Sequence, residues 1–434
     1  MNTRLAKKLR AALAKSDRSF IDQVTALATQ SKRPLYLVGG PVRDLLLGQS
    51  IIDFDLTVEG DAIDLAQQLA KKLRGSIKTH DRFGTAKLIL PTQSASTASR
   101  SGASVDLAST RSETYAQPGA LPDVTPGNLQ SDLIRRDFSI NAMAIRLDGD
   151  HFGELIDMYQ GADDLKRGLV RVLHPQSFTD DPTRIFRAAR FTERFNFKVE
   201  AKTLKLIPAA LPIIDRVSGD RLRREFEAIF KEDQPDRALA LLDQWGVLKQ
   251  IDPEFHLDAE KRLRFRKAAP PFDSLTGWVW LLRRVSLEGR ARIAQRLNLL
   301  VEDSTDLNQV YEIQGQQAAI KDSPAPSVLY QLLSRYSDRA LRTATTIIDD
   351  DRANRKIDHF VNDLHGVKIS IDGQRLQEFG LVPGPAMRRV LESIRDAVLD
   401  GLIVSPQRVE EFAKILIARE QEGNKPGFVQ KPWL

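Results

Sequence analysis

The segment from Leu35 to Glu59, LYLVGGPVRDLLLGQSIIDFDLTVE, constrains the fold of this chain more than any other segment. Its first four residues are apolar and predict a short buried strand. Gly39 and Gly40 interrupt that strand, and glycine allows the backbone to approach a ligand closely. Pro41 suits the first turn of a helix, which Gly48 would end. The segment therefore predicts a strand, a glycine turn and a helix whose free N–H groups favour an anion, most often a phosphate.

A second strand is predicted over residues 52–56, where Asp53 and Asp55 would point to one face and Ile52, Phe54 and Leu56 to the core. Two carboxylates on one face repel each other, which is explained if a divalent metal ion lies between them. Hard oxygen ligands suit Mg²⁺. A glycine pair before a helix is usually only a turn, and an Asp-x-Asp strand is usually a solvated face. Together in one unit they are far more specific.

A third carboxylate follows further along the chain. Residues 104–108 predict a strand in which Val105 and Leu107 face one side and Asp106 the other. Asp106 is the natural companion of the first two carboxylates, although an aspartate at a strand end can also be a solvated residue. Residues 92–104 are rich in Ser, Ala and Thr and predict a mobile surface loop. Residues 111–130 are rich in Pro and Gly and predict a long structureless loop, of the kind that is often functional.

Two arginine-rich stretches complete the set of candidate functional residues. The first, Arg135-Arg136-Asp137-Phe138-Ser139-Ile140-Asn141, keeps its arginines, Asp137 and Asn141 polar among apolar neighbours. The second predicts a helix that begins near Pro182 and presents Arg184, Arg187 and Arg190 along one ridge. Surface salt bridges and a basic helix face are the ordinary explanations of such patterns. Arginine also matches phosphate oxygens bidentately.

Taken together, these motifs resemble those of the tRNA CCA-adding and bacterial poly(A) polymerase family. The family's GG-x-V-R-D and D-x-D signatures match Gly39 to Asp44 and Asp53 to Asp55. Its R-R-D-F-T-I-N-A motif matches with Ser139 in place of Thr, and its E-D-x-x-R motif with Asp180 in place of Glu. A tail pattern, D-G-x-x-L-x-x-x-G-x-x-P-G-P, is similar to part of residues 369–401.

The resemblance implies an α+β fold, in which a polymerase-beta-like nucleotidyltransferase head with a mixed sheet and helices precedes an all-α neck, body and tail. The expected boundaries are residues 1–150 for the head, 151–230 for the neck, 231–365 for the body and 366–434 for the tail. Trp278 and Trp280 in the body are expected in the core rather than as a base-stacking platform.

The resemblance also implies roles for individual residues. Catalysis and metal binding fall to Asp53, Asp55 and Asp106, with two Mg²⁺ ions as cofactors. Gly39, Gly40 and Arg43 would hold phosphates, and Arg135, Arg136, Asp137 and Asn141 the ribose and triphosphate. Asp181 and Arg184 would read the base edge, on a nucleotide-binding helix that also bears Arg187 and Arg190. Arg388 and Arg389, after the helix start at Gly384-Pro385, would hold an RNA phosphate.

The implied activity is template-independent addition of C and/or A residues to the 3′ end of tRNA from CTP and ATP. A poly(A) polymerase, a catalytically inactive RNA-binding regulator and an antibiotic nucleotidyltransferase are the alternatives. The formal charge of +6 favours polyanionic partners. No apolar run approaches the roughly 18–20 residues of a membrane helix, and the chain has no cysteine. We expect a cytoplasmic monomer or homodimer, with an organellar destination left open.

Overall fold

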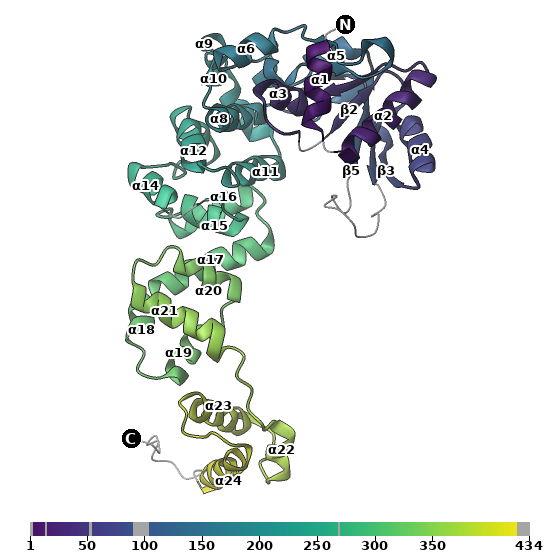
Figure 1. The fold of residues 1–434 in the computed structure, drawn as a ribbon. Coiled ribbons are helices and arrows are strands. Elements are labelled where there is room, and N and C mark those ends of the chain that lie inside the picture. The colour runs from purple at the N-terminus through teal and green to yellow at the C-terminus, as the bar shows by residue number, and fades with distance from the viewer. Residues whose placement is uncertain (1–2, 14, 52–53, 90–103, 268–269, 423–434) are drawn as a thin grey trace. The chain divides into compact units, whose positions relative to one another are not determined.

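The computed structural model describes residues 3–13, 15–51, 54–89, 104–267 and 270–422 (Figure 1). The chain forms two compact units. The first comprises residues 1–271 and 284–298, and the second comprises residues 272–283 and 299–434. Within the described ranges, no helix combines the length and the apolar character needed to cross a membrane. The predicted boundaries between head, neck, body and tail stay predictions.

A seven-stranded sheet forms the head of the first unit, with the strand order β3-β4-β5-β2-β1-β8-β9. Strands β2 and β5 pair in parallel, and every other neighbouring pair is antiparallel, so the sheet is mixed. The strands in chain order are β1 (Leu35–Val38), β2 (Asp55–Val58), β3 (Ser76–His80), β4 (Thr85–Ile89), β5 (Ser104–Ser109), β8 (Ala144–Arg146) and β9 (Leu155–Ile156).

The segment that opened the sequence analysis folds largely as predicted. Strand β1 is buried along its whole length, and α3 (Gly40–Leu47) follows the glycine turn and ends at Gly48, which is left-handed with φ 80°. Strand β2 begins at Asp55, later than the predicted start at residue 52, while Ile52 and Asp53 lie outside the described residues.

The two faces of the sheet differ in character. Alternate residues such as Leu88, Val105 and Leu107 are buried, and α4 (Ala62–Leu73) packs against the strands that contain them. Asp61 caps α4 by accepting hydrogen bonds from the backbone N–H groups of Ile63 and Asp64. Asp55 and Asp106 alternate with the buried positions and are exposed, so they belong to the opposite face.

The prediction of a structureless loop over residues 111–130 is wrong. Strands β6 (Arg111–Thr114) and β7 (Asp123–Pro126) pair antiparallel in this segment, and α5 (Leu129–Ile134) begins before it ends. Both strands have four residues and are mostly polar, so they lack the apolar alternation by which a strand is recognised. The predicted loop over 92–104 lies outside the described residues, except that Ser104 begins β5.

Helices build the rest of the first unit. Helix α8 (Thr183–Phe195) makes two edge-to-face aromatic contacts. The ring of Phe191 lies 5.9 Å from that of Phe138, and the ring of Phe186 lies 5.2 Å from that of Phe226. A two-stranded ribbon pairs β10 (Leu169–Val170) with β11 (Lys198–Val199). The helices are α1 (Thr3–Ala12), α2 (Lys15–Gln30), α6 (Gly161–Arg167), α7 (Ser177–Asp180), α8 (Thr183–Phe195), α9 (Ala201–Leu204), α10 (Ile207–Ala210), α11 (Gly219–Phe230), α12 (Pro235–Gln244), α13 (Val247–Ile251), α14 (Ala259–Lys267) and α16 (Leu287–Arg296).

The described part of the second unit is helical. Trp278 and Trp280 are 0% and 4% exposed, which confirms them as core residues. Helix α23 begins at Pro385 as predicted, and Val390 and Ile394 on it join an apolar cluster with Leu376. The helices are α15 (Ser274–Leu281), α17 (Val301–Gly315), α18 (Gln317–Asp322), α19 (Pro326–Leu333), α20 (Asp338–Thr345), α21 (Asp351–His359), α22 (Gly373–Glu378), α23 (Pro385–Leu399) and α24 (Pro406–Glu422).

Candidate active site

Two carboxylates lie side by side at the centre of the sheet. Asp55 on β2 and Asp106 on β5 are direct partners in the parallel register, and both side chains are exposed on the polar face. Adjacent carboxylates offer the hard oxygen ligands that suit a divalent cation, so this pair fits a metal ion. Asp53 lies outside the described residues, and no group of three or more His, Cys, Asp or Glu in the described ranges forms a metal site.

The glycine turn brings the backbone against an arginine. Gly39 has φ +72°, and a Cβ atom at this position would lie 2.7 Å from Nη1 of Arg136, so both the backbone angle and the space require glycine. Arg43, on the first turn of α3, is buried and donates to Oδ1 of Asn141 at 2.7 Å and to Oδ1 of Asp44 at 2.8 Å. The turn, Arg43 and the Arg135–Asn141 motif therefore form one connected group.

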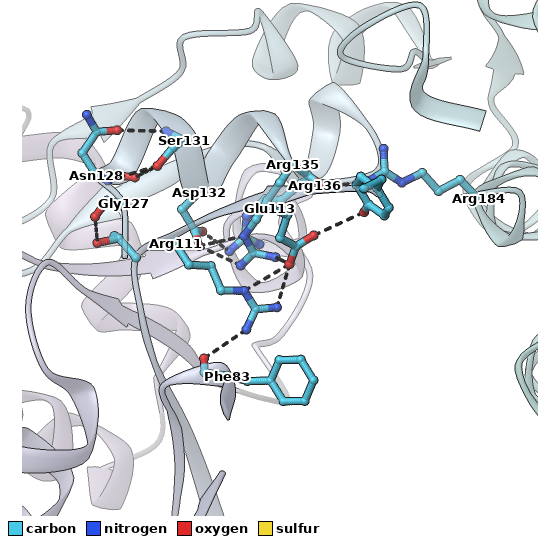
Figure 2. Close-up of polar contacts among 12 residues, drawn as sticks. Phe83, Arg111, Glu113, Gly127, Asn128, Ser131, Asp132, Arg135, Arg136 and Arg184 are labelled. Atoms are coloured by element: carbon cyan, nitrogen blue, oxygen red, sulfur yellow. Dashed lines mark hydrogen bonds and ion pairs between the residues drawn. The ribbon is translucent and has the colours of Figure 1, made fainter. Parts of the chain in front are cut away.

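Asp132 fixes the two neighbouring arginines. Its fully buried carboxylate accepts from Nη2 of Arg135 at 2.7 Å and from Nη2 of Arg136 at 2.9 Å (Figure 2). Burial opposes ionisation of this group, but the charges and hydrogen bonds of Arg136 and Arg135 lower its pKa below the ordinary value. The arginines therefore have a permanent anionic anchor on one side and remain oriented toward the site on the other.

Glu113 was not among the predicted site residues, yet it belongs to the same network. Its Oε1 accepts from Arg111 at 2.9 Å and from Arg135 at 3.1 Å (Figure 2). Its Oε2 accepts from the hydroxyl of Tyr115 at 3.3 Å. Burial, together with the carboxylate of Glu113, raises the pKa of Tyr115 to about 12. The nearby charge of Arg184 opposes this shift but is outweighed by burial. Arg111, Glu113 and Tyr115 are spaced two apart, as residues on one strand face are, and this spacing was the available signal.

Asp137 is buried, and both of its oxygens have partners. Oδ1 accepts from the backbone N–H of Phe138 at 2.8 Å and from Nδ2 of Asn141 at 3.0 Å, while Oδ2 forms an ion pair with Nη2 of Arg187 at 2.7 Å. Burial works against the charged form, but Arg187 and the hydrogen bond from Asn141 lower the pKa of Asp137 below its usual range. Asp137 is therefore an ionised acceptor at neutral pH.

The pair predicted to read the base lies at the start of α8. Arg184 is 4% exposed and donates to Oγ of Ser177 at 2.6 Å and to the carbonyl of Arg135 at 2.7 Å. Oδ1 of Asp181 accepts from the backbone N–H of Thr183 at 3.0 Å and from Nη2 of Arg221 at 2.7 Å. Both side chains are thus held in place by the protein, as groups that must discriminate between bases have to be.

Most of the predicted residues surround one cavity of about 420 Å³. Those that line it are Gly39, Gly40, Arg43, Asp55, Arg135, Arg136, Asp137, Asn141, Asp181, Arg184 and Arg187. Asp106 lines a neighbouring cavity that shares Asp55. Arg190 is not brought to either of these cavities, since it lies 3.8 Å from Glu225 and 3.7 Å from Glu232. Residues three apart on an α-helix differ by about 60° around the helix axis, so Arg190 points about 120° away from Arg184.

The two tail arginines belong to the second unit and are exposed. Arg388 pairs with Glu392 at 2.8 Å on its own helix, and Arg389 pairs with Glu420 on α24 at 2.5 Å. Exposed pairs of this kind contribute little to stability and exchange readily. The predicted RNA-binding role of these two arginines stays a prediction.

A carboxylate pair next to a cavity rich in arginine, with a glycine turn at a helix start, is the arrangement expected of a nucleotidyltransferase. Comparisons with known proteins agree. Residues 35–171 match the model of the poly A polymerase head domain, and residues 196–258 match that of the probable RNA and SrmB-binding site of polymerase A. An A-adding tRNA nucleotidyltransferase of Geobacter sulfurreducens is 35% identical over 85% of this chain, but only 43% of that relative is covered. Another A-adding tRNA nucleotidyltransferase, from Halalkalibacterium halodurans, is 30% identical over 91% of both chains.

Solved structures support the same assignment. An apo form of a CCA-adding enzyme superposes with a TM-score of 0.76 at 29% identity, covering 94% of this chain and 97% of that one. The chain belongs to the family of tRNA nucleotidyltransferases and poly(A) polymerases, which confirms both the resemblance seen in the motifs and the predicted fold class. Nucleotidyltransferases of this family are generally metal-dependent.

Proposed function

We propose that this protein adds C and/or A residues to the 3′ end of tRNA, using CTP and ATP and releasing pyrophosphate. The observation that supports this most is that Asp55, several arginines and the pair Asp181 and Arg184 line one cavity. The Thermotoga maritima CCA-adding enzyme bound to tRNA, with a TM-score of 0.68 at 27% identity and coverage of 94% of this chain, is consistent with a tRNA substrate.

Each group in the cavity has a distinct task in this proposal. Arg43, Arg135 and Arg136 bind the triphosphate, and charge-assisted hydrogen bonds from arginine to phosphate are strong and directional. Asp137 accepts a hydrogen bond from the ribose 2′-hydroxyl, and Asn141 holds its carboxylate in place.

Base choice falls to Asp181 and Arg184, because no nucleic-acid template specifies the incoming nucleotide. An aspartate accepts and an arginine donates, which matches the edge of cytosine and, after a small shift, that of adenine. Strands β6 and β7 are candidates for the element that permits this shift, since Glu113 connects them to Arg135.

Asp55 and Asp106, with Asp53, would hold Mg²⁺. When bound, such ions lower the pKa of the attacking hydroxyl and neutralise the charge that develops on the phosphates. The partners proposed are tRNA, ATP and CTP, and the tail from 366 to 434 would contribute to tRNA binding through Arg388 and Arg389. The cytoplasm is the proposed location.

Addition of A alone is a second candidate, since the relatives from Geobacter sulfurreducens and Halalkalibacterium halodurans, with 35% and 30% identity, are A-adding tRNA nucleotidyltransferases. A CC-adding tRNA nucleotidyltransferase of Deinococcus radiodurans, 37% identical over 55% of this chain, represents the opposite division of labour. The two activities differ in which tRNA end they accept.

One experiment tests the proposal and separates these candidates. The purified protein is incubated with tRNAs that end before, within or after CC, with CTP, ATP or both, and the products are resolved at single-nucleotide length. Complete CCA addition extends all incomplete ends, whereas A addition extends only the tRNA that ends in CC. Long A tails on an unrelated RNA would indicate a poly(A) polymerase, and no extension of any tRNA would overturn the proposal.

A further inference from the structure

A second cavity, of about 400 Å³, is lined by both exposed carboxylates, Asp55 and Asp106. It shares Asp55, Arg135 and Arg136 with the nucleotide cavity, and its other lining includes Lys87 on β4 and His80 on β3. The nucleotide cavity already contains groups for a triphosphate, a ribose and a base. A transfer reaction has two reactants, so the second cavity is available for the one that is extended.

The strand register arranges the floor of this cavity in two rows. Directly opposite residues of neighbouring strands lie on one face of a sheet, about 4.8 Å apart. The first row is Asp55, Asp106 and Lys87, and the second is Thr57, Ala108, Thr85 and His80. Lys78 continues the first row on β3 but does not line the cavity. The second row has small residues at its centre, which leaves space above it. The first row changes from acidic at β2 and β5 to basic at β4 and β3.

This order of charges matches the end of an RNA strand. A terminal nucleotide has a neutral 3′-hydroxyl at one end and an anionic phosphodiester at the other. The carboxylates mark the position of the reacting hydroxyl, and Lys87 would attract the phosphodiester that precedes it.

We propose that this cavity binds the 3′-terminal nucleotide of the RNA acceptor and that Lys87 contacts its phosphodiester; this inference rests on the function proposed above. Nζ of Lys87 lies 3.5 Å from the Asp106 carboxylate, and the two side chains are 46% and 60% exposed. An exposed pair at this distance is weak. The ammonium can therefore leave Asp106 for a phosphate while its flexible stem remains on β4.

A purely structural role for Lys87, as the counter-ion of Asp106, predicts a different behaviour. In that case the Lys87→Met substitution changes turnover with every acceptor, and its effect on binding is independent of the charge on the RNA. A double-mutant cycle between the lysine and one phosphodiester separates the two roles. The Lys72→Met substitution is the matched control, because Lys72 is an exposed lysine in the last turn of α4, which packs on the opposite face.

The experiment uses the full chain and an acceptor-stem minihelix that ends in CC. Its last phosphodiester is either normal or replaced by a neutral methylphosphonate, and binding is followed by fluorescence anisotropy over a range of salt concentrations. We expect the Lys87→Met substitution and the methylphosphonate each to weaken binding by about fivefold. Together they are expected to weaken it no more than either one alone. The log–log salt slope should fall by about 0.7 for one lost contact with a single strand.

Losses that multiply in the double combination, or a Lys72→Met variant that behaves like Lys87→Met, would overturn the assignment of this cavity. Extension of the normal minihelix by the unsubstituted protein is measured in parallel. If the minihelix is extended but the losses multiply, only the acceptor site is refuted. If no tRNA or minihelix is extended, the proposed function and the acceptor site are refuted together.

Discussion

Replacing Arg184 with alanine separates base reading from structural support. The guanidinium donates to Ser177 and to the carbonyl of Arg135, at 2.6 and 2.7 Å, which uses two of its five N–H groups. Loss of a buried hydrogen-bond partner costs about 1–3 kcal/mol. If Arg184 reads the base, this cost falls on the correct nucleotides only, and Arg184→Ala should relax selection against UTP and GTP by roughly ten- to a hundredfold.

The hydrogen bond between Arg184 and Ser177 can be removed separately as a control. Ser177→Ala removes one bond from Arg184 but leaves the guanidinium in the cavity, so it should lower the melting temperature without relaxing base choice. Arg184→Lys keeps the charge and loses the planar fork, and it should resemble Arg184→Ala in selection while retaining more stability. The assay is kcat/KM for all four nucleoside triphosphates on a tRNA lacking CCA, alongside thermal melting. A uniform loss with all four nucleotides would refute base reading by Arg184.

Three further predictions concern other parts of the network. Asp137→Ala should narrow the preference for ATP over dATP by about tenfold, because we propose that the carboxylate accepts a hydrogen bond from the 2′-hydroxyl; an unchanged ratio of kcat/KM values would identify a purely structural residue. The pKa of Asp132 is lowered from 3.8, so its charge stabilises the folded state above that pH, and the stabilisation is lost as the pH falls through the lower folded-state pKa. Asp132→Asn should therefore lower the free energy of unfolding by about 3–5 kcal/mol at neutral pH. It should also flatten the dependence of the unfolding free energy on pH below about 4. A variant whose stability curve runs parallel to that of the unsubstituted protein over this pH range would contradict this. Alanine at both Arg388 and Arg389 should reduce the salt slope of tRNA binding by about one unit per lost phosphate contact, whereas equal slopes would argue against the tail.

Local sequence was sufficient for the parts of the site that depend on short-range physics. The turn at Gly39 and the helix after it follow from a buried strand, two glycines and a proline. The exposed carboxylate of Asp106 follows from alternation along β5, whose apolar neighbours are buried. Each of these features is determined by residues within about five positions of one another, so it can be predicted from the sequence alone.

The remaining parts depend on contacts between distant segments. Lys87 lies opposite Asp106 only because β4 and β5 pair in that register, which no local pattern specifies. Glu113 gains its role from Arg135, 22 positions later in the chain. Arg190 shares a three-residue spacing with Arg184 and Arg187, but the turn of the helix carries it to Glu225 and Glu232 instead. Spacing along a helix predicts which residues lie on neighbouring parts of its surface, but the packing of the helix determines which partner each of them contacts.

The carboxylate pair is tested most directly by the substitution Asp55→Ala. Extension of a tRNA lacking its CCA end is measured with CTP, ATP and Mg²⁺, together with binding of the same tRNA and the melting temperature. Asp55 is exposed at the start of β2, so the fold and tRNA binding should stay near those of the unsubstituted protein. Nucleotide addition should be abolished. Near-normal addition by the purified variant would contradict the assignment of this site as the catalytic centre.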